Sequence, residues 1–182
     1  FLLALLHDLR LTDFPEIMTL TGYTKMTVSR AINELKKLGL CEKSEGYKAQ
    51  IRFSENKREL WEAGLPYLQS PIIEEVYVHE CAFNKKFKHT GYTALAEYSD
   101  ISKGNLKSFA IHRKDYKSDP KFTYPGLAFP EEGGVQIQLW TYDPHIVDKS
   151  NTVDPLSLFL TMRSDNDDRT QMALEQMISS VL

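Results

Sequence analysis

The chain has 182 residues, of which 42% are hydrophobic and 26% charged, and its formal net charge is −3 at pH 7. These proportions are typical of a folded globular protein and exclude disordered, fibrous and histone-like polybasic chains. No apolar run is long enough to cross a membrane, and two cysteines do not make a disulfide framework, so we expect a cytoplasmic protein without a membrane partner. Because the chain begins with Phe1, we expect some native N-terminal sequence to be missing.

Residues 13–38 are the most informative stretch, because they predict two helices joined by a tight turn. The first helix, over residues 15–21, ends at Gly22, the residue type that most readily adopts positive φ after a helix. Its side chains Ile17 and Leu20 are expected to be buried. This arrangement is typical of a helix-turn-helix.

The second helix is expected over residues 25–38, after Thr24 as its N-cap. Its apolar side chains share one face at helical spacing, and they are Val28, Ala31, Ile32, Leu35 and Leu38. The opposite face offers cations, an amide and small polar groups, which a helix in the major groove of DNA uses. The candidate DNA-binding residues of this helix and its cap are Thr24, Lys25, Met26, Thr27, Ser29, Arg30, Asn33 and Lys37.

The flanking segments complete an N-terminal domain over residues 1–69. Residues 1–10 predict a short amphipathic helix that packs behind the pair. Residues 40–53 predict two strands around a turn, and a closing helix follows with Ser54 as its N-cap. The candidate phosphate contacts of the hairpin are Lys43 and Lys48. Two helices, a recognition helix and a hairpin in this order indicate a winged helix-turn-helix domain.

The segment GYTKMTVSRAINELKKLGLCEKSEGYKAQIRFS, residues 22–54, resembles MarR-type winged-helix transcription regulators. The resemblance rests on the run TVSRAI in the second helix and on Gly39-Leu40 before the hairpin, and it covers roughly the first domain. It implies a bacterial transcription regulator, a repressor, that reads the major groove of double-stranded DNA with residues 25–38.

Charge is distributed unevenly between the two halves of the chain. Residues 1–69 hold 10 Lys and Arg against 9 Asp and Glu, whereas residues 70–182 hold 12 against 16. Because the first domain is nearly neutral, we expect two copies to share DNA binding as a homodimer. The same balance leaves a second hypothesis open, in which the winged helix docks a protein and the acidic domain binds a basic partner.

The second domain, residues 70–182, begins at a proline that disfavours helix in the residue before it. We expect a small mixed α+β domain with Val135, Ile137 and Leu139 on one face of a strand. The expected strands are residues 72–79, 107–113, 135–143 and 156–163, and the expected helices are residues 91–101 and 167–182. Asp165, Asn166, Asp167 and Asp168 are expected to cap the last helix and oppose its dipole.

The run GYTALAEYSDIS, followed by KSFAIHR, resembles a helix and strand of AbiEi-type antitoxins, which also join a winged helix to an α+β domain. This resemblance implies an autoregulating repressor that binds its own promoter, has a partner toxin and takes no small-molecule effector. An effector pocket is the alternative, since aromatic side chains gather in this domain, although core packing is their expected role. They are Phe109, Tyr116, Phe122, Tyr124, Phe129, Trp140 and Tyr142.

Catalytic and metal-binding patterns are weak, so we predict neither an enzyme nor a cofactor. His79, Glu80 and Cys81 are consecutive, and neighbouring strand residues point to opposite faces, which prevents them from chelating one ion together. Asp115 and Lys117 match the acid-x-Lys triplet of metal-dependent nucleases, but no second carboxylate can be assigned to it. No GxGxxG, P-loop or GxSxG run occurs.

Overall fold

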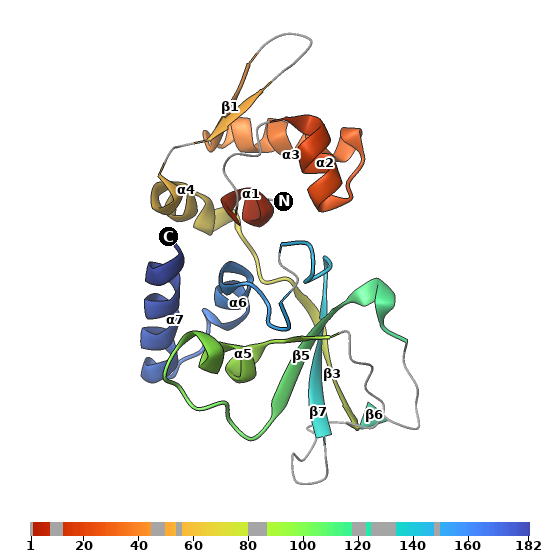
Figure 1. Ribbon diagram of the computed structural model, residues 1–182, viewed down its shortest axis with the longest axis vertical. Coiled ribbons are helices and arrows are strands. Elements are labelled where there is room, and N and C mark those ends of the chain that lie inside the picture. Colours follow the sequence, from red (N-terminus) through yellow and green to blue (C-terminus); the bar gives the residue numbers. More distant parts are fainter. Residues whose placement is uncertain are drawn as a thin grey trace. The chain divides into compact units, whose positions relative to one another are not determined.

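A computed structural model of the protein describes residues 2–7, 13–44, 50–53, 56–79, 87–117, 123–124, 134–147 and 150–182. The chain divides into two compact units, residues 1–68 and residues 69–181 (Figure 1). Both units contain helices and strands, so the α+β class predicted from the sequence is confirmed. Among the described residues, no helix has the length and apolar character needed to cross a membrane.

The first unit packs its helices against one another and one of them against a two-stranded antiparallel sheet. In chain order its elements are α1 (Leu2–His7), α2 (Phe14–Thr21), α3 (Lys25–Lys37), β1 (Cys41–Lys43), β2 (Ile51–Phe53), α4 (Lys57–Gly64) and the 3-10 helix η1 (Leu65–Tyr67). The strand pairing sets Cys41 opposite Phe53 and Lys43 opposite Ile51. Among the described residues, the apolar side chains of this unit with no exposed surface come from α1, α2, α3 and β2, and they are Leu5, Leu6, Ile17, Val28, Ile32 and Ile51.

Three local expectations for this unit are wrong in detail. The N-cap of α4 is Asn56, whose side chain accepts hydrogen bonds from two backbone N–H groups of the first turn, rather than Ser54, which lies outside the described residues. Leu38 is 39% exposed because α3 ends one residue earlier and Leu38 is its C-cap. Leu20 is only half-buried, and Thr21 takes the buried position at the end of α2.

The second unit is built on a five-stranded mixed sheet with the strand order β4-β5-β7-β3-β6. Its elements are β3 (Ile72–His79), β4 (Lys88–His89), α5 (Gly91–Tyr98), β5 (Lys107–His112), the 3-10 helix η3 (Arg113–Asp115), β6 (Thr123–Tyr124), β7 (Gly134–Trp140), α6 (Pro155–Met162) and α7 (Asp168–Val181). Strands β5 and β7 are parallel, and the other pairs are antiparallel. Helix α5 packs on the sheet face of Ser108, since a Cβ on Gly91 would lie 3.3 Å from the Ser108 Cβ.

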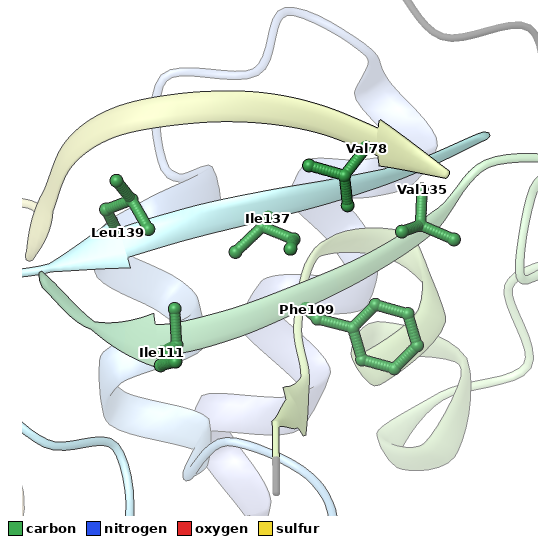
Figure 2. Packing of buried hydrophobic residues seen from close by; sticks show 6 residues of the cluster. All are labelled: Val78, Phe109, Ile111, Val135, Ile137 and Leu139. Atoms are coloured by element: carbon green, nitrogen blue, oxygen red, sulfur yellow. The ribbon is translucent and has the colours of Figure 1, made fainter. Parts of the chain in front are cut away.

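The opposite face of this sheet holds an apolar cluster, drawn in Figure 2. The cluster consists of Val78, Phe109, Ile111, Val135, Ile137 and Leu139, with Val76, Phe87 and Tyr116 packed against it. The predicted shared face of the three β7 residues is therefore confirmed. Among the aromatics expected in the core, Phe109 and Trp140 are buried, whereas Phe122 and Phe129 lie outside the described residues.

Residues 156–163, predicted as a strand, instead form helix α6 up to Met162, and Arg163 is its C-cap. Asp154 caps this helix by accepting a hydrogen bond from the Ser157 backbone N–H at 2.9 Å, and Pro155 occupies its first turn. The helix is buried on several sides, so its sequence is apolar almost throughout and shows no helical period. Asp154 followed by Pro155 is a sequence typical of a helix start, and it indicated this helix although the apolar run had no helical period.

Candidate nucleic-acid interface

Helices α2 and α3 are joined by a turn whose conformation is fixed locally. Asp13 caps α2 by accepting a hydrogen bond from the Glu16 backbone N–H at 3.0 Å. At the other end, Gly22 adopts a φ of 68°, and its N–H donates to the Met18 carbonyl at 2.9 Å. Glycine adopts this left-handed conformation without the steric cost that a Cβ adds, so the turn directs the chain into α3.

Thr24 begins α3 as the sequence predicts. Its Oγ1 accepts a hydrogen bond from the Thr27 backbone N–H at 3.3 Å, which satisfies one of the free donors of the first turn. The hydroxyls of Thr24 and Thr27 also lie 3.1 Å apart as a hydrogen-bonded pair. Both threonines are exposed, so the cap stands at the surface of the unit.

The two faces of α3 are sharply divided. Val28, Ile32 and Leu35 are buried beneath it, and α3 contacts both α2 and β1 (Figure 1). Opposite them, helical spacing sets four exposed side chains in one row, which we call the outer row: Met26, Arg30, Asn33 and Lys37. Lys25, Thr24 and Thr27 are also exposed, and Ser29 is half-buried. Eight of the ten candidate DNA-binding residues are therefore neighbours on or beside one helix.

The C-terminal half of the outer row borders a shallow groove lined by Arg30, Asn33, Glu34, Lys36 and Lys37. Lys37 is ion-paired with Glu34, with 2.8 Å between Nζ and Oε1. Among the described residues, neither Lys25 nor Arg30 forms such a pair, so their charges face solvent. Sequence reasoning missed Lys36 and Glu34 as members of this surface, although their i+3 and i+4 spacing from Asn33 and Arg30 would have indicated them.

The hairpin candidates are arranged differently. Lys43 on β1 is half-buried, and its Nζ lies 5.2 Å from the centre of the Phe14 ring on α2. This cation–π contact ties the hairpin to the helix pair. Lys48 lies outside the described residues. At the base of the hairpin, the Ser44 N–H donates to the Gln50 carbonyl at 2.9 Å.

Cys41 anchors β1 beneath α3. Its thiol lies 3.7 Å from the Ile32 carbonyl oxygen and is buried. Burial raises the pKa of the Cys41 thiol, an effect that the nearby charge of Lys36 partly offsets. The thiol therefore stays protonated at neutral pH and serves as a small packing group.

The structure describes only some of the residues behind the catalytic alternatives in the second unit. His79 is half-buried at the end of β3, and Glu80 and Cys81 lie outside the described residues. Asp115 is exposed, and its Oδ2 lies 3.9 Å from His112 Nδ1. Across the described part of the chain, no three His, Cys, Asp or Glu side chains converge as a metal site.

In comparisons with known proteins, no protein-family model, curated protein or solved structure matches the chain.

Proposed function

We propose that the protein is a sequence-specific transcription regulator that binds double-stranded DNA by inserting α3 into the major groove. In this proposal the first unit is a winged helix-turn-helix domain similar to those of MarR-type repressors. The observation that carries the proposal is the outer row of α3, four exposed side chains with base-reading and phosphate-binding groups, opposite three buried apolar ones. An α-helix of 13 residues is about 20 Å long, enough to follow the groove across several base pairs.

The side chains of α3 divide into base-reading and phosphate-binding groups in this proposal. Arg30 donates to the O6 and N7 acceptors of guanine, and Asn33 pairs with adenine, as their fork and amide geometries allow. Lys25 neutralises a phosphate, Lys37 contributes less because it is paired with Glu34, and the small hydroxyls of Thr24, Thr27 and Ser29 donate to the DNA backbone. Met26 has no charge and no strong donor, so it neither neutralises a phosphate nor donates a hydrogen bond to a base.

The near-neutral first unit favours a pair of α3 helices over a single one. Because residues 1–69 hold 10 Lys and Arg against 9 Asp and Glu, we propose a homodimer whose two α3 helices bind successive major-groove half-sites. The acidic second unit then acts in regulation or assembly rather than in catalysis. This division predicts that incubation with duplex DNA and Mg²⁺ or Mn²⁺ leaves the DNA intact.

Salt-dependent binding to the gene's own upstream region tests the proposal. A DNA-binding regulator shifts this duplex at nanomolar to micromolar concentration, prefers it over a scrambled duplex, and loses affinity linearly in log salt. Absence of any salt-dependent, sequence-selective binding would contradict it.

A second candidate is an interaction module in which the α3 surface binds protein. The observation that favours it is the charge balance of residues 1–69, with 10 Lys and Arg against 9 Asp and Glu. An antitoxin-type autoregulator without a small-molecule effector combines both roles. The salt experiment separates the alternatives, because only DNA releases a counterion atmosphere on binding.

A further inference from the structure

Met26 is the one apolar member of the outer row of α3. Its side chain is 64% exposed, although a methionine usually stays buried in a core. It lies in the first turn of the helix, one turn before Arg30. An exposed thioether in this row contributes nothing to phosphate binding, since it has neither charge nor a strong donor.

The residues beside Met26 in the first turn of α3 form the N-terminal cap of the helix. The Thr24 and Thr27 hydroxyls are hydrogen-bonded to each other at 3.1 Å, and Thr24 also accepts from the Thr27 N–H. One hydroxyl of this pair therefore donates to the other, and the second hydroxyl can still donate to a ligand. Beside this hydroxyl, the Lys25 charge and the free N–H groups of the first turn, this end of α3 also offers apolar surface, namely the Met26 side chain and the threonine methyl groups.

The major groove carries one apolar group, the C5-methyl of thymine. We infer that Met26 is a specificity-determining residue that selects thymine by covering this methyl group, an inference that rests on the proposed function. The rise of about 1.5 Å per residue separates Met26 from Arg30 by roughly 6 Å along the helix. Since base pairs are spaced about 3.4 Å apart, the thymine lies within about two base pairs of the purine that Arg30 reads.

Replacing thymine by deoxyuridine tests the inference, because this change removes the methyl group and keeps every hydrogen-bonding group. A preferred duplex is first selected from a random pool with the full chain, and each thymine is then replaced singly. We expect one replacement in each half-site to weaken binding about fourfold, the effect of removing one buried methyl-sized group. Met26→Ala should weaken binding to the thymine duplex and bind the thymine and deoxyuridine duplexes equally well.

Met172→Ala is the matched control, because Met172 is similarly exposed, at 70%, on α7 in the second unit. It should keep the wild-type preference for thymine, and neither variant should change the melting temperature, since both side chains face solvent. Selective binding that no deoxyuridine weakens, or a fourfold loss that Met26→Ala retains, would refute the inference while leaving the proposed function standing. Failure to select any duplex would refute both.

Discussion

The Nζ of Lys37 donates to the Oε1 of Glu34 across 2.8 Å on the exposed surface of α3. Both residues border the groove that also contains Arg30 and Asn33. A carboxylate on a DNA-binding helix repels phosphate, and here it also engages a cation that would otherwise bind one. Exposed ion pairs of this kind contribute little to stability, so the pair is more important for binding than for folding.

Glu34→Gln should therefore strengthen DNA binding. The change removes a negative charge and frees Lys37 for phosphate, so the slope of log affinity against log salt should steepen by about one unit. Fluorescence anisotropy at several salt concentrations measures both quantities. Glu62→Gln, on the exposed side of α4, serves as the charge-matched control and should change neither. A lower affinity of Glu34→Gln would indicate that the carboxylate itself accepts a hydrogen bond from a base.

Arg30→Ala should weaken binding to the preferred duplex by about 1–3 kcal/mol, the contribution of a bidentate contact to guanine. Because Arg30 is exposed and unpaired among the described residues, the melting temperature should not change. Arg58→Ala, an exposed arginine on α4, removes the same charge as a control and should retain affinity. If both variants bind as tightly as the wild type, α3 faces a partner other than DNA.

Gly22→Ala should destabilise the first unit by about 1 kcal/mol, because the alanine would have to adopt a φ of 68°. Steric contact is not the cause, since a Cβ at Gly22 would meet no atom within 4 Å. Gly22→Asn should cost less, as asparagine tolerates the left-handed region better. Chemical denaturation of the three proteins tests this order, and equal stabilities would show that the turn relaxes to another conformation.

Local signals explain why the helix pair could be predicted from the sequence. Gly22 ends α2 and Thr24 begins α3 through hydrogen bonds to nearby residues, and the buried side chains Val28, Ile32 and Leu35 keep a helical period in α3. The α6 segment lacked such a period because the interior surrounds it, so burial removed the information that distinguishes helix from strand. The contact of Lys43 with Phe14 was not predictable, since it joins a strand to a helix more than 25 residues away in sequence.

Asp167 provides a pH-dependent contribution to the second unit. Its Oδ2 accepts hydrogen bonds from the backbone N–H and the Oγ1 of Thr170, each at 2.9 Å, which confirms the predicted cap of α7. These two bonds hold the pKa of the Asp167 carboxyl below its ordinary value. A lowered pKa in the folded state means that the stabilisation is present above the unfolded value of about 4 and is lost as pH falls through the folded pKa.

Asp167→Asn should therefore flatten the loss of stability between about pH 4 and the folded pKa, because an amide oxygen caps the helix without titrating. Thermal melts from pH 7 to pH 3 compare the variant with the wild type, and the difference between the two curves isolates this carboxylate from the others. Asp168→Asn, which keeps both bonds between Asp167 and Thr170, is the control variant in the same melts. If the melting temperature of Asp167→Asn falls with pH as steeply as that of the wild type, the bonds between Asp167 and Thr170 do not make the stability depend on protonation of Asp167.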